Sequence, residues 1–277
     1  MGVDWNEYER DSEILLENLI PKEKEKLRHI LDRLENVALF DGIYKKNDIY
    51  TRDELIKFKK MNSIEYSIKK VDDYYQLGNF RLPVCSFEPS IFYDKYKLNE
   101  LSNKIPNDRV IFDVGALCGD STLILNEMFP NHKIYAFEPI LNNYNNIFKT
   151  IELNQLNNVI PTNLALANET GEREFEYGGR NLCRVDTLDN FVSVNNLKVG
   201  LIKTDIEGGE WDMLLGAEKT IKEQKPTLIL SVYHNYRDFF KIKPLIESWN
   251  LGYRFSWTDS CYGVCPIHEI TLNCEVY

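Results

Sequence analysis

The sequence lacks any apolar run that approaches the roughly 20 residues a membrane-spanning helix needs. Its first stretch, MGVDWNEYERDSE, is acidic and has no apolar core of the kind that a secretory signal peptide requires. Asn6 stands where an N-myristoylation motif needs Ser or Thr. The six cysteines are scattered along the chain, as expected of reduced thiols. Together these absences predict a cytoplasmic protein with no membrane span.

An excess of positive charge is missing as well. The chain carries 33 Lys and Arg against 43 Asp and Glu, a formal net charge of -10. Generic nucleic-acid binders and anionic-membrane binders need a basic field, so neither kind of partner is expected. Hydrophobic residues make up 43% of the 277 residues, which is enough apolar material for one large α/β domain with an appendage.

Histidine is scarce, with four residues, and one group of side chains has the composition of a zinc site. It comprises Cys261, Cys265, His268 and Cys274. The spacing matches no common zinc module, and Cys274 falls in an alternating, strand-like segment. Ordinary packing of these side chains is therefore favoured, and no metal site is predicted.

Residues 110–138 have the pattern of a nucleotide-binding βαβ unit. VIFDV, at 110–114, is typical of a buried parallel strand, and Gly115 and Gly119 bracket the turn that follows it. A helix is expected from Asp120 onward, because DST supplies helix-starting side chains before an apolar run. A second strand at 133–137 ends in Glu138, a carboxylate placed to accept both hydroxyl hydrogens of a ribose.

Two classes of cofactor fit this unit. A dinucleotide fold favours G-x-G-x-x-G, whereas this turn reads G-A-L-C-G and has Leu117 where the second glycine should lie against a pyrophosphate. S-adenosylmethionine has no pyrophosphate and tolerates Leu117. NAD remains the alternative at this point.

The rest of the chain predicts a seven-stranded sheet. Its strands are expected at residues 110–114, 133–137, 159–166, 199–204, 227–233, 253–257 and 269–277. The last two are joined by a short connection without a helix and must be antiparallel to each other. A mostly parallel sheet closed by an antiparallel final strand separates class I methyltransferases from six-stranded dinucleotide folds, so the pattern favours S-adenosylmethionine.

Three side chains are expected to gather at the carboxyl edge of this sheet, where open α/β folds bind ligands. Asp205 and Glu207 follow the strand at 199–204, and His234 follows the strand at 227–233. Unpartnered carboxylates are costly beside a cofactor, which indicates function for Asp205 and Glu207. Glu210 is expected to stabilise the start of the next helix.

Residues 1–79 are predicted to form a helical appendage, and residues 80–277 the catalytic domain. Leu27, Ile30 and Leu31 belong to one apolar stripe, and Thr51 with Glu54 makes a capping box for a helix expected over 55–75. Packing on the main domain, a lid over the substrate entrance and a dimerisation surface are all compatible with this region. The aromatic segment 80–101 is placed to cover the cofactor mouth.

Four stretches of the chain resemble the FkbM family of S-adenosylmethionine-dependent methyltransferases. They are FDVGALCGDST, YAFEP, LIKTDIEGGEWDMLLGAE and LSVYHN, and the resemblance covers about residues 80–277. It implies a class I methyltransferase (Rossmann-like) fold and O-methylation of a hydroxyl on a sugar, a glycan or a related metabolite, as in polysaccharide biosynthesis. A small-molecule or glycan acceptor is expected, and a homodimer through the N-terminal helices is possible.

The resemblance also implies a set of cofactor-binding residues. Glu138 would hold the ribose, Asn163 and Ala165 would border the adenine, and Asp205 would lie near the amino end of the cofactor and the acceptor. The residues expected around the methionine end and elsewhere in the pocket are Asp113, Gly115, Ala116, Gly119, Asp120, Ser121 and Pro139.

A sugar hydroxyl becomes a good nucleophile only as its proton leaves, so a positioned base is expected. The position of His234 predicts that it takes this proton while Asp205 or Glu207 orients it. A divalent ion held by Asp205 and Glu207 is a weaker variant. The rival readings are an NAD-dependent sugar oxidoreductase or epimerase and a non-catalytic scaffold with a cofactor fold.

Overall fold

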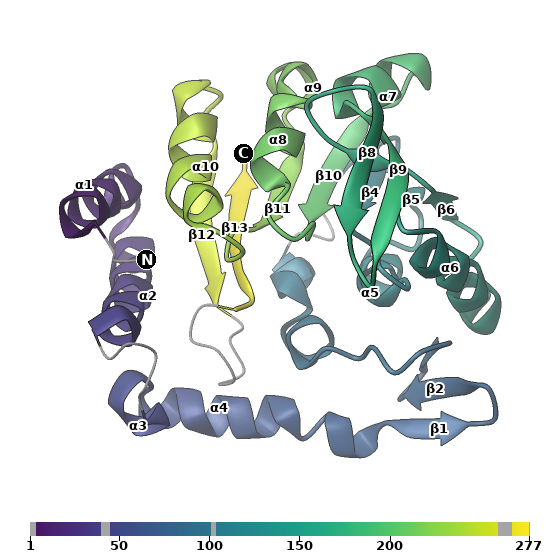
Figure 1. Cartoon of the computed structure of the whole chain (residues 1–277), viewed down its shortest axis with the longest axis horizontal. Helices are drawn as coiled ribbons and strands as arrows, with labels where there is room; N and C mark the ends of the chain where they lie inside the picture. Colours follow the sequence, from purple (N-terminus) through teal and green to yellow (C-terminus); the bar gives the residue numbers. More distant parts are fainter. Residues whose placement is uncertain (1–3, 40–44, 101–103, 260–267, 277) are drawn as a thin grey trace.

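The structure is a computed structural model, and it describes residues 4–39, 45–100, 104–259 and 268–276. A twisted central sheet with helices on both faces forms its main body, and the N-terminal helices lie beside and beneath it (Figure 1). This is the α/β architecture that the alternation of strands and helices predicts.

The central sheet has seven strands in the order β12-β13-β11-β10-β4-β5-β6. The strands are β4 (Val110–Val114), β5 (Ile134–Phe137), β6 (Val159–Thr162), β10 (Val199–Thr204), β11 (Thr227–Ser231), β12 (Arg254–Asp259) and β13 (Ile270–Glu275). β4 pairs in parallel with β5 and β10, while β13 runs antiparallel to both β11 and β12. The predicted class I methyltransferase topology is therefore confirmed.

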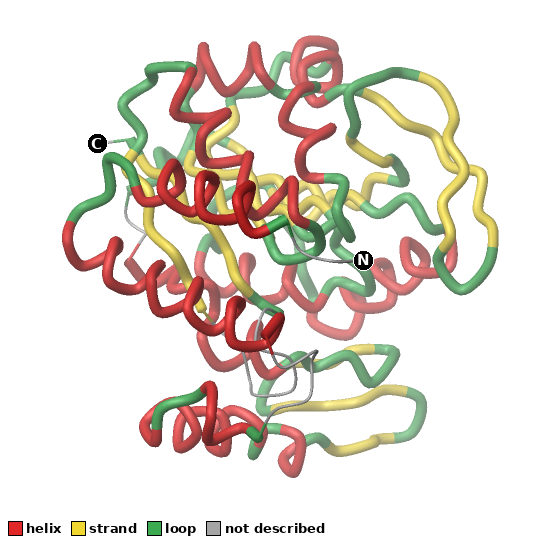
Figure 2. Tube along the Cα trace, turned by 60° about the vertical axis from the view of Figure 1, so that its left-hand side comes forward, coloured by secondary structure: helices red, strands yellow, loops and turns green. Residues whose placement is uncertain are grey.

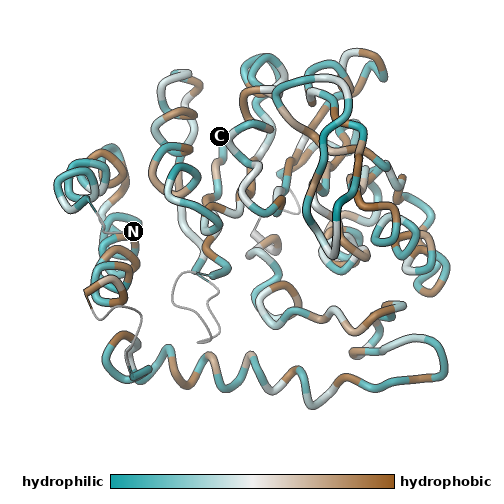
Figure 3. Tube along the Cα trace, viewed as in Figure 1, coloured by the Kyte–Doolittle hydropathy of each residue, from teal (hydrophilic) through white to brown (hydrophobic). Residues whose placement is uncertain are grey.

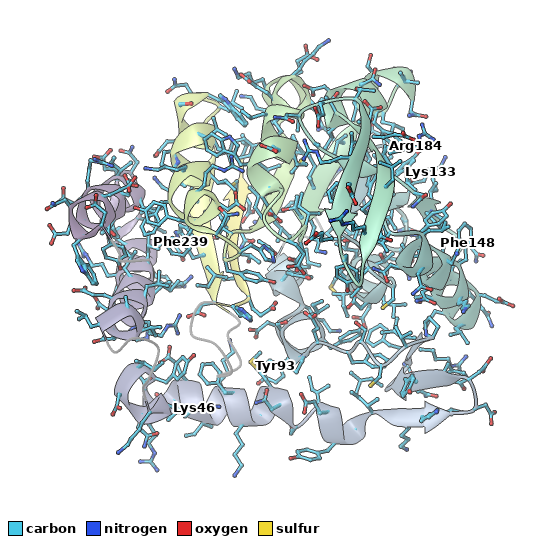
Figure 4. The ribbon with its side chains drawn as sticks, in the orientation of Figure 1. Lys46, Tyr93, Lys133, Phe148, Arg184 and Phe239 are labelled. Carbon is cyan, nitrogen blue, oxygen red and sulfur yellow. The ribbon has the colours of Figure 1, made fainter. Side chains whose placement is uncertain are left out.

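Helices cover both faces of this sheet (Figure 2). One face carries α5 (Asp120–Met128) and α6 (Leu141–Asn154), and the other carries α7 (Leu188–Val194), α8 (Glu210–Leu215), α9 (Glu218–Gln224) and α10 (Tyr236–Ser248). Alternate residues of β4 supply the two cores, with Ile111 on the α5 side and Phe112 on the opposite side. On that opposite side Phe239 of α10 packs against Trp257, with ring centroids 5.6 Å apart (Figure 4).

Two predicted elements of the main domain are divided in the structure. The strand expected over 159–166 is wrong as a single unit, because β6 ends at Thr162 and β7 (Ala165–Leu166) joins a second sheet with β8 (Gly171–Glu176) and β9 (Arg180–Asp186). The helix expected to follow Glu210 is divided into α8 and α9 at Gly216, where an added Cβ would lie 2.0 Å from the carbonyl oxygen of Ala167. In both places the small β7-β9-β8 sheet sets the boundary.

The N-terminal region is only partly helical. Its helices are α1 (Trp5–Leu16), α2 (Pro21–Leu39), α3 (Lys46–Ile49) and α4 (Arg52–Asn62), and the capping box of Thr51 and Glu54 is confirmed. The helix predicted over 55–75 is wrong beyond Asn62. A 3₁₀ turn (η1, Glu65–Ser67) and a small antiparallel sheet follow, made of β1 (Lys69–Val71), β2 (Tyr74–Leu77) and β3 (Phe80–Leu82). α4 and this sheet lie beneath the main body, with apolar and polar residues alternating along α4 (Figure 3).

Helix α2 covers the exposed edge of the main sheet at β12. Glu23 accepts a hydrogen bond from the backbone N–H of Trp257 (2.9 Å), and Lys26 donates one to the carbonyl oxygen of the same residue (2.8 Å). The buried Arg33 pairs with Asp259 and Glu54. Side chains of α2 therefore satisfy backbone groups that an edge strand leaves open to other chains.

Within the aromatic segment, before β4, the chain forms a π-helical turn (η2, Ser90–Asp94) and a 3₁₀ turn (η3, Lys95–Glu100). Phe87 and Phe92 are buried there and their rings lie 5.1 Å apart. Among the described residues, no helix is both long and apolar enough to cross a bilayer. Of the possible zinc group, Cys261 and Cys265 lie outside the described residues.

The turn after β4 lies directly against the turn after β10. Gly115 has φ +80°, and a Cβ added there would lie 1.9 Å from the carbonyl oxygen of Asp205. The N–H of Asp205 donates to the carbonyl oxygen of Val114 at 2.9 Å, which fixes this approach. Gly115 is therefore required by contact between two stretches of backbone as well as by its left-handed conformation.

This contact generates a stability prediction. Gly115→Ala should lower the free energy of unfolding by about 3 kcal/mol or more, because strain at positive φ adds to an overlap that only a backbone shift relieves. Gly178→Ala is the matched control, since Gly178 has φ +61° and open space around it, and should cost about 1 kcal/mol. Urea unfolding of both variants measures the difference. Equal losses would contradict the close approach of the two turns.

Candidate functional site

A cavity of about 610 Å³ opens at the carboxyl edge of the parallel strands. The ends of β4, β5 and β10 form its floor, and β8 and the π-helical turn contribute to its walls. Seven of the predicted site residues line it: Gly115, Asp120, Glu138, Pro139, Ala165, Asp205 and Glu207. Six others do not: Asp113, Ala116, Gly119, Ser121, Asn163 and His234.

Glu138 lies at one end of the cavity with a carboxylate fixed by the backbone. One oxygen accepts a hydrogen bond from the N–H of Ile140 (2.9 Å), and the other accepts one from the N–H of Leu117 (3.0 Å). The side chain of Asn143 also hydrogen-bonds this carboxylate, and lone pairs remain on it to accept a ribose hydroxyl. Burial raises the pKa of Glu138 to about 7, against the opposing effect of these hydrogen bonds.

Asp113 forms a buried ion pair beneath the floor of the cavity. Lys203 reaches across from β10, with its Nζ 3.1 Å from a carboxylate oxygen of Asp113 and 3.2 Å from the carbonyl oxygen of Gly115. Ser121 and Thr122 donate their hydroxyl hydrogens to the same carboxylate. Burial alone would lower the pKa of Lys203, but the surrounding carboxylates, Asp113 foremost, outweigh it and raise that pKa. Asp113 and Ser121 therefore hold the glycine turn in place from below.

Some residues that were expected to contact the cofactor lie behind the cavity wall and hold its turns in place. Ala116 is fully buried in a small cluster between β5 and α6, and Gly119 precedes α5 in a left-handed conformation. The side chain of Asn163 donates to the carbonyl oxygens of Glu138 and Pro139, each at 2.9 Å. Asn163 therefore fixes the turn that carries Glu138, while its neighbour Ala165 reaches the cavity wall.

The other end of the cavity holds the acidic turn after β10. Asp205 and Glu207 line the cavity, and the Nε2 of His234 lies 3.5 Å from a carboxylate oxygen of each. The structure thus brings together the three side chains that the sequence placed on this edge. His234 stands behind the two carboxylates, because its side chain is 10% exposed and does not line the cavity.

Glu210 closes the same turn from beneath. Its carboxylate accepts hydrogen bonds from the N–H groups of Ile206 (2.8 Å) and Gly208 (3.1 Å), and the residue is fully buried. Burial raises the pKa of Glu210 to about 8. The expected stabilisation of the helix start takes the form of these two backbone contacts, and Glu210 also lies 3.9 Å from the Nδ1 of His234.

Carboxyl groups dominate the lining of the cavity. The acidic lining residues are Glu88, Asp120, Glu138, Glu176, Asp205, Glu207 and Asp212, and the basic ones are Arg173 and Lys203. Both basic side chains already carry ion pairs, with Glu169 and Asp113 respectively. Burial, reinforced by neighbouring carboxylates, raises the pKa of Glu88 to about 9. The field of the cavity favours a ligand with positive charge and disfavours phosphate groups.

This arrangement fits S-adenosylmethionine. Its ribose diol matches the free lone pairs of Glu138, and its sulfonium and ammonium groups match the acidic lining. Leu117 causes no obstruction, because a left-handed backbone (φ +48°) turns its N–H to Glu138. Asp120, at the glycine turn, is the lining carboxylate that would receive the amino group, while Ala165 and Leu164 would border the adenine.

Residues 181–255 match the family model described as the Methyltransferase FkbM domain. The matched segment includes Lys203, Asp205, Glu207 and His234, and therefore the acidic end of the cavity. The chain is also similar to Methyltransferase 1 of Beauveria bassiana (strain ARSEF 2860), with 24% identity over 220 residues. That similarity covers 65% of this chain and 87% of the relative.

Among solved structures, the chain is similar to the FkbM methyltransferase of Methylobacillus flagellatus KT. The TM-score is 0.63 at 17% sequence identity, and the match covers 99% of this chain and 60% of that one. The shared fold therefore extends over the N-terminal helices as well as the central sheet. This chain spans about 60% of the length of that structure.

Sequence reasoning missed two contributors to the site. Lys203 carried a usable signal, because a lysine inside the apolar strand VGLIKT must find a partner when it is buried. The residues of the second contributor, the wall formed by Arg173, Phe175 and Tyr177, lie on a strand that could be expected before the Gly178–Gly179 loop. Their place on the cavity could not be predicted, because it depends on how β8 and β9 pack beside the central sheet.

The raised pKa of Glu138 generates a prediction about cofactor binding. If the ionised carboxylate accepts the ribose hydrogens, the Kd of S-adenosylhomocysteine should be about tenfold weaker at pH 6 than at pH 8, because Glu138 is mostly protonated below pH 7. Calorimetric titration at both pH values measures this ratio.

Two variants control that experiment. Glu138→Gln should bind weakly at pH 8 and show little change between the two pH values. Glu176→Gln removes a different carboxylate that lines the cavity and should keep the wild-type ratio. A Glu138→Gln variant with wild-type affinity at pH 8 would remove Glu138 from ribose binding.

Proposed function

We propose that this chain, a methyltransferase of the FkbM type that uses S-adenosylmethionine, methylates a hydroxyl group of a sugar, a glycan or a related small metabolite. The single observation that carries the proposal is the layout of the cavity. Glu138 lies at one end, where it can hold a ribose, and the Asp205–Glu207 pair lies at the other, where an acceptor can be oriented. Between them the cavity is large enough for a cofactor of this size and part of an acceptor.

The bound cofactor supplies a methyl group on a sulfonium, whose sulfur keeps the electron pair of the broken carbon–sulfur bond. The protein must place an oxygen in line with that methyl group and exclude water from it. Asp205 is held rigidly for this purpose, because its N–H is bonded to Val114 and its carbonyl oxygen lies against Gly115. The phenol of Tyr233 lies 3.4 Å from the carboxylates of both Asp205 and Glu269, and it narrows the acceptor end.

The proton of the acceptor hydroxyl must leave as the oxygen attacks. We assign its removal to the carboxylates of Asp205 and Glu207, because both line the cavity while His234 stands behind them. Glu207 is the more accessible, with a side chain that is 76% exposed and can pass a proton to solvent. His234 takes a positioning role in this assignment, in place of the direct proton acceptor that its place in the sequence suggested.

Carbohydrates suit the lining of the acceptor end. Carboxylates accept hydrogen bonds from hydroxyl groups, and the ring of Tyr233, beside Asp205, offers a flat apolar surface at this end. The alternative of an NAD-dependent oxidoreductase fits less well, because a pyrophosphate would enter a cavity with seven acidic and two basic lining residues. A non-catalytic scaffold fits less well too. Carboxyl groups buried around a cavity that binds nothing would lower the stability of the fold, and no ligand would compensate for that loss.

The test of this function is product analysis. The full chain is incubated with S-adenosylmethionine and a panel of mono- and oligosaccharides, and the products are examined by mass spectrometry and NMR. The expected product is a methyl ether on a sugar oxygen, formed with one equivalent of S-adenosylhomocysteine. Transfer to nitrogen or carbon alone, or turnover of none of the hydroxyl acceptors, would contradict the proposal.

The assignment of the proton gives a kinetic prediction. Glu207→Gln should lower kcat about 10²-fold, because the amide cannot take the proton, while the Kd of S-adenosylhomocysteine stays unchanged. His234→Ala should lower turnover by up to about 10²-fold with cofactor binding intact, because the carboxylates that the ring positions are then displaced. Steady-state kinetics with the acceptor found above, together with calorimetry, measures both.

Glu176→Gln serves as the matched control, because it also removes a carboxylate from the cavity lining but lies on β8 and outside the acidic turn. If both Glu207→Gln and His234→Ala turned over substrate at close to the wild-type rate, the acidic turn would not be the catalytic end of the cavity.

A further inference from the structure

Three side chains converge beneath the acceptor end of the cavity. Asp205 directly follows β10, Glu210 begins α8, and His234 follows β11. One nitrogen or carboxylate oxygen from each lies within 4.8 Å of the others, and this is the one group of three or more potential metal ligands in the part of the chain that the structure describes. β10 pairs in parallel with β11, and the Glu210 carboxylate accepts two N–H bonds from the turn after β10, so the approach of the three residues is built into the fold.

His234 provides a second and independent observation. Its side chain is nine-tenths buried, and its Nδ1 has no hydrogen-bond partner although a buried ring nitrogen normally has one. That nitrogen faces the carboxylate of Glu210 at 3.9 Å, and the Nε2 lies 3.5 Å from Asp205. These separations exceed ordinary hydrogen bonds. One ion takes only one of the two ring nitrogens, so the two separations belong to two alternative ways of binding it. Each approaches the roughly 3.4 Å that separates ligand atoms in a tetrahedral site with bonds of about 2.1 Å, and in the group as a whole one donor atom of each residue lies within 4.8 Å of the others.

We propose that Asp205, Glu210 and His234 bind a divalent first-row transition-metal ion, such as Mn²⁺, and that this ion receives the acceptor hydroxyl. One imidazole and two carboxylates form a mixed donor set that suits Mn²⁺, Fe²⁺, Co²⁺ or Zn²⁺ better than Ca²⁺. The carboxylate of Glu210 already accepts two backbone N–H bonds, which orient it and leave a lone pair on each oxygen. The two positive charges of the ion would balance the two carboxylates, while the imidazole ring binds it as a neutral ligand.

The position of the site gives the ion a function. Asp205 lines the cavity while Glu210 and His234 lie behind it, so the open coordination position faces the acceptor. A carboxylate is a weak base toward an aliphatic hydroxyl, and coordination of that hydroxyl to the ion would make its proton easier to remove. Glu207, the exposed neighbour in the same turn, would take that proton. The inference rests on the proposed function for this step, but binding of the ion does not.

The test measures Mn²⁺ binding to the full chain after removal of metal with a chelator. Electron paramagnetic resonance of the free ion during a titration should show one Mn²⁺ bound per chain. His234→Ala should weaken that binding at least about tenfold. His268→Ala is the matched control, since His268 lies at the same edge, 5.5 Å from the ring of Tyr233, but outside the three ligands, and it should leave Mn²⁺ affinity unchanged.

Asp205→Asn provides a second ligand variant in case His234→Ala does not fold, and it should also weaken binding about tenfold. Calcium should bind at least about tenfold more weakly than Mn²⁺ in the wild type. The proposal would be overturned if Ca²⁺ and Mn²⁺ bound equally well, or if both ligand variants kept the wild-type affinity for Mn²⁺. Either result would mean that the ion is attracted by negative charge in general and not by these three ligands.

The binding experiment needs no acceptor, so its failure differs from failure of the proposed function. Mn²⁺ binding that depends on His234 would support the site even if no hydroxyl acceptor were methylated. Methyl transfer by a metal-stripped chain that binds no Mn²⁺ would overturn the metal site and leave O-methylation standing.

Discussion

The buried ion pair between Lys203 and Asp113 is the constraint on which the site depends. Lys203 is the single charged residue of β10, and its ammonium group is shared by the carboxylate of Asp113, the carbonyl oxygen of Gly115 and the hydroxyl of Ser121. Breaking one side of such a pair leaves an unpaired charge in the core, at a cost of about 3–5 kcal/mol. The pair therefore ties the glycine turn after β4 to the strand that carries Asp205.

The geometry of the cavity follows from that tie. With the two turns in contact, the backbone N–H of Leu117 is directed at Glu138, and the acidic turn after β10 is held across the cavity from it. A surplus of carboxyl groups, of which Asp120 and Glu138 are buried, then surrounds the space between them. Natural cores avoid such a surplus unless a cation compensates for it, which is why a sulfonium cofactor and a divalent ion are the ligands that this cavity suits.

Sequence patterns predicted the central sheet well and the peripheral parts poorly, for a physical reason. β4, β10 and the C-terminal strands are buried on both faces or alternate cleanly, so their apolar runs indicate their limits to within one or two residues. The β7-β9-β8 sheet and the β1-β2-β3 sheet are short and polar, and they form because distant segments pair. Their propensity alone is too weak to predict them.

The site residues also differ in how well the sequence predicted their place. Glu138, Asp205 and Glu207 could be placed on the cavity from the order of strands alone, since each follows a parallel strand. That Asp113 and Asn163 support the turns instead of lining the cavity could not be predicted, because their hydrogen-bond partners come from other elements.

A crystal structure of the chain with S-adenosylhomocysteine would test the central claim most directly. The account predicts that both ribose hydroxyls lie within hydrogen-bond distance of the Glu138 carboxylate and that the sulfur points toward Asp205. A nucleoside bound elsewhere, or a ribose that makes no contact with Glu138, would contradict it.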